Sequence, residues 1–277
     1  MQSFNRSDRD IKERLNDCLP QSLQASARIY GLRHFKIKIN GNLQTDMDRL
    51  EKIADALRQS AARDFRFSLD ANEQFKSVAA FREYWQIVTR HDSEFFNRLL
   101  FVEQPLHRDV ALQPGVEKEW KAWPDRPAII VDESDGTLDA VPTALRLGYA
   151  GASHKNCKGV IKGIANACLL KHSLGMMTGE DLCNIGPVAL LQDLAVMATL
   201  GIESVERNGH HYHAGLSQFP RKIQEQVLAH HGDLYGETTD GWPAVRITNG
   251  SIELGSVNQA PFGTDFLLDT TELKRIA

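Results

Sequence analysis

Short apolar runs alternate with longer amphipathic stretches along most of the chain. In the short runs apolar residues are consecutive or occupy every second position, which predicts strands; in the longer stretches they recur every three to four residues, which predicts helices. The predicted strands are residues 35–39, 66–72, 99–103, 128–133, 151–155, 176–180 and 204–206. The predicted helices are residues 8–30 with a break near Pro20, 45–62, 78–89, 138–147, 161–172 and 187–200. Thr45 is expected to cap its helix, and Pro187 to lie in a first helical turn.

A polar residue closes each predicted strand, and these residues are regularly spaced. They are Lys38, Asp70, Glu103, Asp132, Lys155, Glu180 and Glu206, at intervals of 23 to 33 residues. Intervals of this length suit βα units, so the chain predicts a parallel α/β barrel or a doubly wound open sheet. Neither GxGxxG nor GxxxxGK[ST] occurs, which removes the main nucleotide-binding reason to prefer the open sheet. We therefore expect a TIM-like barrel with its chemistry at the carboxyl ends of the strands.

The pattern changes after Glu206. Residues 220–243 are polar and predict irregular or partly helical structure. Residues 245–254 predict a β-hairpin around Asn249-Gly250, a pair that favours a type I′ turn. The expected organisation is a barrel over residues 1–219 and a C-terminal extension with a β-hairpin over residues 220–277.

Composition restricts the classes of protein to consider. The 277 residues are 42% hydrophobic and 25% charged, which is typical of a soluble globular protein with a substantial core. A net charge of −4 and a pI near 6.2 argue against a general nucleic-acid or anionic-membrane binder. The absence of a long apolar run and of a signal-peptide core makes the cytoplasm the expected location. The scattered cysteines predict reduced, mostly buried thiols; they are Cys18, Cys157, Cys168 and Cys183.

Two lysines alternate with apolar residues in the first predicted strand, Phe35-Lys36-Ile37-Lys38-Ile39. Successive side chains on a strand point to opposite faces, so Lys36 and Lys38 should project from the same face. Repulsion between two neighbouring ammonium groups lowers the pKa of at least one, toward the range in which a lysine can exchange a proton near neutral pH. Taken alone, the pair also fits an edge strand with solvated lysines.

Three acidic residues, Asp70, Glu103 and Asp132, end consecutive predicted strands. In a closed barrel these strand ends converge, and three carboxylates repel one another unless a hard cation such as Mg²⁺ neutralises them. Any one of them alone also fits a helix cap or a solvated loop.

Lys155 ends the next predicted strand, across the barrel mouth from Lys38. It also fits a surface lysine in the basic group that contains Lys158 and Lys162. A metal that holds a substrate carboxylate stabilises the enediolate formed when the α-proton leaves. A lysine on each face of the substrate can then remove or deliver that proton.

Together these segments resemble the enolase superfamily, most closely the muconate-lactonizing branch of the mandelate racemase group. The matching segments are Phe35-Lys36-Ile37-Lys38, Leu69-Asp70-Ala71-Asn72, Val102-Glu103-Gln104-Pro105, Val131-Asp132-Glu133-Ser134 and Lys155. The resemblance runs from about Asp10 to about Asp269 and implies a modified (β/α)7β barrel.

The resemblance also implies roles for individual residues. Mg²⁺, or Mn²⁺, would be held by Asp70, Glu103 and Asp132. Lys38 and Lys155 would form the acid/base pair, with Lys36 as the neighbour that tunes Lys38. Asn72 and Glu206 resemble polar groups that line the family's substrate site.

The activity implied by the resemblance is abstraction of the α-proton of a small carboxylate substrate through an enediolate. Two opposed lysines favour an isomerase, a racemase or epimerase, because each face of the substrate then has its own base. A cycloisomerase or an acid-sugar dehydratase of the same superfamily, or a truncated barrel without catalytic activity, are the alternatives.

The sequence also departs from the family pattern. The α+β capping domain that precedes the barrel in family members, and the first barrel strand, are not recognisable, so we expect a barrel that is incomplete at its first strand. The open edge would expose backbone and apolar surface, which predicts oligomerisation, rearrangement or low stability, with a homo-oligomer as the favoured expectation. The run Lys155-Asn156-Cys157-Lys158-Gly159 differs from the branch's usual lysine and Gly-Gly ending, which leaves the role of Lys158 open.

Histidines form a further motif after the last predicted strand. His210, His211 and His213 fit either zinc ligands or a loop that lines the substrate or is solvated, and no fourth zinc ligand is recognisable. His154 should point to the face of its strand opposite Lys155 and is expected to be a buried histidine.

Overall fold

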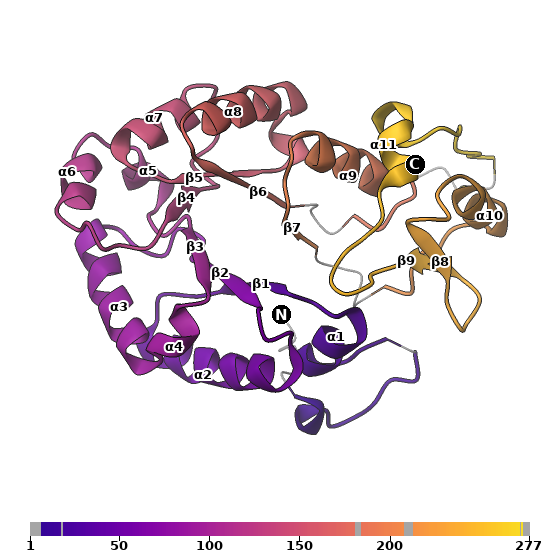
Figure 1. The fold of residues 1–277 in the computed structure, drawn as a ribbon, viewed down its shortest axis with the longest axis horizontal. Coiled ribbons are helices and arrows are strands. Elements are labelled where there is room, and N and C mark those ends of the chain that lie inside the picture. Colours follow the sequence, from indigo (N-terminus) through magenta and orange to yellow (C-terminus); the bar gives the residue numbers. More distant parts are fainter. Residues whose placement is uncertain (1–6, 18, 181–183, 208–212, 272, 274–277) are drawn as a thin grey trace. The chain divides into compact units, whose positions relative to one another are not determined.

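The computed structural model describes residues 7–17, 19–180, 184–207, 213–271 and 273 (Figure 1). It divides into two compact units: unit 1 comprises Met1–Leu32 and Glu180–Ala277, and unit 2 comprises Arg33–Gly179. The main sheet takes its seven strands in sequence order, β1 to β7, with helices between them. The expected fold class, a TIM-like α/β barrel, is confirmed. The expected domains, residues 1–219 and 220–277, were defined by the change of sequence pattern and stay a prediction.

Unit 2 carries the regular part of the sheet. Its strands are β1 (His34–Lys38), β2 (Arg66–Asp70), β3 (Leu99–Glu103), β4 (Ile129–Val131), β5 (Gly151–His154) and β6 (Met176–Glu180), whose last residue is counted with unit 1. Each of these strands pairs in parallel with the next. Because parallel neighbours run in the same direction, their carboxyl ends all lie along one edge of the sheet.

Helices connect these strands and form the outer layer of unit 2 (Figure 1). They are α2 (Leu43–Ser60), α3 (Val78–His91), α4 (Ser93–Phe96), α5 (Arg108–Ala111), α6 (Val116–Lys121), α7 (Ala140–Leu147), the 3₁₀ turn η2 (Asn156–Lys158) and α8 (Val160–His172). The prediction that Thr45 caps its helix is wrong. Helix α2 begins two residues earlier, and the Asn42 side chain accepts the Thr45 backbone N–H at 3.0 Å.

Alternation along the strands separates an apolar core from the polar edge of unit 2. Phe67 and Leu69 are fully buried, and the ring of Phe67 stacks on Phe95 of α4 with centroids 4.2 Å apart. Further aromatic contacts join α3 and α6 through Phe81 and Trp120. The apolar faces of the helices therefore pack against one face of the sheet. The polar residues that alternate with the apolar ones along the strands point to the opposite face.

Unit 1 has its own core. Its elements are η1 (Asp8–Asp10), α1 (Leu23–Tyr30), α9 (Ala189–Thr199), β7 (Val205–Glu206), α10 (Arg221–His230), β8 (Tyr235–Glu237), β9 (Pro243–Val245), α11 (Gly255–Gln259) and η3 (Pro261–Gly263). Leucines of α9 pack with Val227, Tyr235 and Val257, all of them buried. The segment predicted as the first helix, residues 8–30, is mostly irregular before Leu23, where α1 begins. The predicted position of Pro187 in a first helical turn is wrong, because α9 begins at Ala189.

A C-terminal hairpin exists, but the predicted location is wrong. The antiparallel pair is β8 with β9, which ends at Val245, whereas residues 246–254 contain only the single bridge Thr248–Ser251. The predicted turn is nevertheless present, since Asn249 and Gly250 both have positive φ, 51° and 74°. This turn packs on the end of α1, where Gly250 N–H donates to the Tyr30 carbonyl at 2.7 Å. A Cβ on Gly31 would lie 2.7 Å from Asn249 Cα, so the contact requires glycine there.

Two smaller expectations have different outcomes. Cys157 and Cys168 are free but exposed, so the prediction of buried thiols is wrong for them; Cys18 and Cys183 lie outside the described residues. His154 is 3% exposed, as expected of a buried histidine. Among the described residues, no helix is long and apolar enough to cross a membrane.

The ring of His154 fills the space between β5 and α8. Its Nε2 lies 3.0 Å from Asn156 Oδ1, and burial lowers the pKa of the imidazole. Gly163 of α8 faces this ring, and a Cβ there would lie 2.3 Å from His154 Cε1. The helix can approach the strand this closely because position 163 has no side chain.

Gly163→Ala should destabilise unit 2. The added methyl overlaps the His154 ring, and overpacking of this kind costs about 1–3 kcal/mol of unfolding free energy. Urea unfolding followed by circular dichroism measures the loss. Gly136→Ala is the matched control, because a Cβ there meets nothing within 4 Å, and it should change stability by less than about 0.5 kcal/mol. Equal stabilities of the two variants would contradict the packing argument.

Candidate active site

Three strand ends bring the predicted carboxylates together in unit 2. Asp70 ends β2, Glu103 ends β3, and Asp132 directly follows β4. Register pairs Asp70 with Glu103, and Glu103 with Ile130, two residues before Asp132. All three are buried, at 1–2% exposure, and oxygens of Glu103 and Asp132 lie within 4.8 Å of each other. The expected convergence is therefore present.

The two lysines of β1 both face these carboxylates. Lys36 Nζ lies 3.0 Å from Asp70 Oδ2 and 3.0 Å from Glu103 Oε2. Lys38 Nζ donates to Asp70 Oδ2 at 2.8 Å and to Asn72 Oδ1 at 3.1 Å. The predicted common face is correct, and the alternative of a strand with solvated lysines does not hold for Lys36, whose side chain is 12% exposed.

Two more lysines reach the site from the other side, after β5. Lys155 Nζ donates to Asp132 Oδ2 at 2.9 Å, and Lys158 Nζ donates to Asp132 Oδ1 at 2.6 Å. Asp132 thus accepts an ammonium group on each carboxylate oxygen. Lys158 comes from η2 rather than from a strand, which is why the strand pattern did not assign it.

Asn72 links Lys38 to a further carboxylate, Glu133. Its side-chain oxygen accepts from Lys38, and its Nδ2 donates to Glu133 Oε1 at 3.0 Å. Asn72 has φ of 38°, a left-handed conformation that asparagine tolerates better than most residues. Glu133 was not predicted as a site residue, although its position next to Asp132 in Val131-Asp132-Glu133-Ser134 could have indicated it.

Gln104 is a second residue that the strand-end pattern missed. It is 1% exposed, and its Oε1 accepts the backbone N–H groups of Asp132 at 2.8 Å and Ser134 at 3.2 Å. Its Nε2 donates to Leu106 O at 2.8 Å and Ser134 Oγ at 2.7 Å. Its carbonyl accepts the Glu73 N–H at 2.9 Å. Gln104 therefore joins the loops that follow β2, β3 and β4, through its side-chain amide and its main-chain carbonyl.

The carboxylates differ in charge state because their lysine partners differ. Burial works to raise the pKa of Asp70, but Lys36 and Lys38 outweigh it and hold that pKa below its usual value. Burial likewise opposes Lys158 and Lys155 at Asp132, and the lysines again hold the pKa low. At Glu103, burial dominates and the charges of Asp70 and Asp132 add to it, so the pKa rises to about 8 despite Lys36. Burial also raises the pKa of Glu133.

The donor set fits a hard divalent cation. Asp70, Glu103 and Asp132 supply carboxylate oxygens from three adjacent strand ends, which suits Mg²⁺ or Mn²⁺. Burial and the neighbouring carboxylates raise the pKa of Glu103, and the charge of Lys36 offsets this only in part. A bound cation would supply further positive charge and favour the carboxylate form.

The remaining predicted residues lie in unit 1. Glu206 ends β7 and is half-buried, and its part in substrate binding stays a prediction. His213 is exposed, whereas His210 and His211 lie outside the described residues, so the zinc hypothesis stays open.

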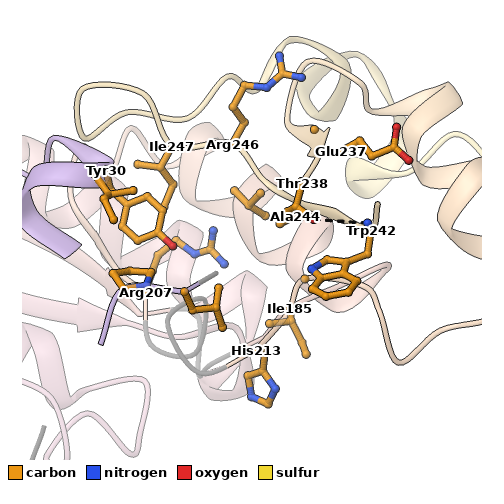
Figure 2. Close-up of a pocket in the computed structure, with 16 residues that line it drawn as sticks. Tyr30, Ile185, Arg207, His213, Glu237, Thr238, Trp242, Ala244, Arg246 and Ile247 are labelled. Carbon is orange, nitrogen blue, oxygen red and sulfur yellow. Dashed lines mark hydrogen bonds between the residues drawn. The ribbon is translucent and has the colours of Figure 1, made fainter. Parts of the chain in front are cut away.

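Unit 1 also contains a cavity of about 320 Å³, drawn in Figure 2. Figure 2 shows the Arg207 guanidinium turned into the space between Tyr30 and Trp242, while Arg246 and Glu237 point away. Most of its other lining side chains are apolar. The volume is at the lower end of the range for small-ligand pockets. The described residues that line this cavity do not include the carboxylates and lysines of unit 2.

Comparison with known proteins identifies the fold of this chain. No protein-family model and no curated protein matches the chain. Solved structures do match, among them a mandelate racemase/muconate lactonizing enzyme from Roseiflexus sp., with 18% identity over 67% of this chain and 50% of that chain and a TM-score of 0.52. The N-succinyl Arg/Lys racemase from Bacillus cereus matches with 15% identity over 85% of this chain and 57% of that chain, TM-score 0.50.

A third solved structure is the dipeptide epimerase from Enterococcus faecalis complexed with Mg and the dipeptide L-Leu-L-Tyr. It matches with 16% identity over 66% of this chain and 48% of that chain, TM-score 0.50. The chain spans about half the length of these structures. At these identities the likeness establishes the barrel fold, and the fold is the one that the sequence resemblance implied.

The raised pKa of Glu103 predicts a pH-dependent stability of the metal-free protein. Between its ordinary pKa of 4.5 and its raised value of about 8, the folded protein binds a proton that the unfolded chain has lost. Stability from this group is therefore complete at low pH and is lost as pH rises through that window, by up to about 1.4 kcal/mol per pH unit. Glu103→Gln should flatten this dependence.

Urea unfolding in EDTA at a series of pH values measures the effect. Glu119→Gln, at an exposed position of α6, should keep the slope of the parent protein. Identical slopes for Glu103→Gln and the parent would contradict the assigned pKa.

Proposed function

We propose that this chain carries the catalytic centre of an Mg²⁺-dependent enzyme of the enolase superfamily that removes and returns the α-proton of a carboxylate substrate. The favoured reaction class is racemisation or epimerisation, an isomerase activity. The observation that carries the proposal is the arrangement of lysines around one set of carboxylates. Lys38 contacts Asp70 from β1, and Lys155 contacts Asp132 from the end of β5, with Glu103 between these carboxylates in strand order.

Asp70, Glu103 and Asp132 are the residues that would hold the cation. When bound, Mg²⁺ supplies positive charge that stabilises the enediolate as the α-proton leaves. Two of the matching structures, a racemase and an Mg-complexed epimerase, support this reaction class. Since the chain spans about half their length, the substrate and the activity of the whole protein belong to this proposal.

The two lysines would divide the proton transfer. A neutral lysine on one face accepts the α-proton and becomes an ammonium group, and the ammonium group on the opposite face donates a proton to the same carbon. Lys38 and Lys155 would have these roles, in either direction. Lys36, held between Asp70 and Glu103 on the same face of β1, would position these carboxylates beside Lys38.

Glu133 and Asn72 would orient the substrate beside these lysines. Asn72 contacts Lys38 directly, and Glu133 is fixed through Asn72, so a polar group of the substrate could replace either contact. A cycloisomerase or dehydratase would use the same first step and then expel a group from the β-carbon. Product analysis separates these reactions from racemisation. A small-molecule carboxylate partner and a homo-oligomer are further parts of the proposal.

Proton exchange in D₂O tests the two-base assignment. Dipeptides, N-succinyl amino acids and mandelate are the probe substrates, with Mg²⁺ present, and ¹H NMR follows loss of the α-proton signal. Lys38→Met and Lys155→Met should each reduce racemisation about 10²–10⁴-fold, the usual contribution of a general acid/base group. Each variant should still exchange the α-proton of the one enantiomer that faces the remaining lysine.

The exposed Lys121 provides the matched control, because it lies on the outer helix α6 and pairs with Glu117 of the same helix. Lys121→Met should keep the activity of the parent. Exchange at parental rates in both site variants would refute the assignment. Absence of exchange in the parent with every probe, together with tight Mn²⁺ binding, would favour a barrel that binds metal without turnover.

A further inference from the structure

Lys158 is held more completely than an ordinary ion-pair lysine. Its Nζ donates to Asp132 Oδ1 at 2.6 Å, to the Asp132 carbonyl at 2.8 Å and to the Ser153 carbonyl at 3.0 Å. These three acceptors use all three N–H groups of the ammonium. The side chain is 14% exposed, so water can replace little of this bonding.

The acceptors of Lys158 lie on the sheet of unit 2, at the end of β4 and in β5. Two are main-chain carbonyls, one directly after β4 and one within β5. A second ion pair lies beside Lys158. Lys162 Nζ is 3.0 Å from Asp135 Oδ1, and Asp135 Oδ2 is 4.0 Å from Lys158 Nζ. Lys158 could leave Asp132 Oδ1 only by also giving up its hydrogen bonds to two backbone carbonyls.

We infer that Lys158 is a built-in counter-ion of Asp132 that lowers the affinity of the centre for its divalent cation. The inference rests on the proposed function, because it concerns the same carboxylates. A cation that binds Asp132 has to share this carboxylate with an ammonium group that stays in place. Two positive charges on one buried carboxylate repel each other with little screening by solvent.

An opposite effect has to be weighed against this repulsion. Groups that orient metal ligands contribute about 10–100-fold to metal affinity, so loss of Lys158 could also weaken binding. However, Asp132 keeps two other restraints. Its backbone N–H donates to Gln104 Oε1, and its Oδ2 accepts from Lys155. The position of the carboxylate therefore survives the loss of Lys158, and the change of charge dominates.

The counter-ion links cation binding to the substrate. A carboxylate substrate brings a negative charge that offsets the Lys158 ammonium, so the cation should bind more tightly when an anion is bound with it. The centre would then be filled mainly when its substrate is present.

Titration with Mn²⁺ alone tests the inference without relying on activity. Free Mn²⁺ is measured by electron paramagnetic resonance in the full chain and in Lys158→Gln, whose amide can still donate to Asp132 but carries no charge. We expect the variant to bind Mn²⁺ at least about tenfold more tightly than the parent. Lys158→Met is the second neutral variant, in case Lys158→Gln does not fold, and circular dichroism verifies folding.

Two controls separate charge from structure. Lys158→Arg keeps the charge and should retain the parental Mn²⁺ affinity. Lys162→Gln removes an ammonium of similar burial that contacts Asp135 instead of Asp132, and should change the affinity less than threefold. In the metal-free state, Lys158→Gln should also have a lower melting temperature than the parent, and Mn²⁺ should raise that temperature more in the variant.

The outcomes distinguish the two proposals. If the parent binds Mn²⁺ and the neutral variants bind it equally or more weakly, the counter-ion role is wrong while the proposed function stands. If neither the parent nor the neutral variants bind Mn²⁺ at millimolar concentration, both are wrong. Tighter binding by Lys162→Gln as well would mean that any loss of positive charge acts, and would overturn the specific role of Lys158.

Discussion

Three carboxylates buried at adjacent strand ends repel one another, and the architecture of unit 2 depends on how that repulsion is balanced. Asp70 and Asp132 each contact two lysines, whereas Glu103 contacts Lys36 at the centre of the set. Removing one partner of a buried ion pair costs about 3–5 kcal/mol. The pairing of β1 with β2 and of β2 with β3 therefore has an electrostatic reason in addition to its backbone hydrogen bonds, because a shift by one residue would turn each lysine toward the apolar side of the sheet.

The sequence predicted the barrel well because its signals were repeated. Strands 99–103 and 176–180 have the predicted bounds, and most others differ by one or two residues. Every strand carried an apolar run, and every run ended in a polar residue at a similar interval, so no single ambiguous segment could change the result. The carboxylates followed from the same regularity, since parallel strand ends meet at one edge whatever the details of the helices.

Features that depend on contacts between distant residues could not be predicted in this way. Asn42 and Thr45 are both good capping residues, and only the path of the loop after β1 selects Asn42. The Asn249-Gly250 turn was visible, but its use against the end of α1 was not, and the true hairpin lies earlier. Lys158 sits in a 3₁₀ turn, where no period of two or 3.6 places it on a face. Its contact with Asp132 requires the fold to be known.

Gln104 has a consequence for the motions of the protein. Its single buried amide holds the backbone of Asp132 and Ser134, and its carbonyl holds the backbone of Glu73, so the loops after three strands share one set of hydrogen bonds. Local opening of the loop after β3 would leave polar groups of the other two unsatisfied, and opening of either of those would leave polar groups of Gln104 unsatisfied. The carboxylate edge of unit 2 should therefore open to solvent as one cooperative segment, with similar amide hydrogen-exchange rates after β2, β3 and β4.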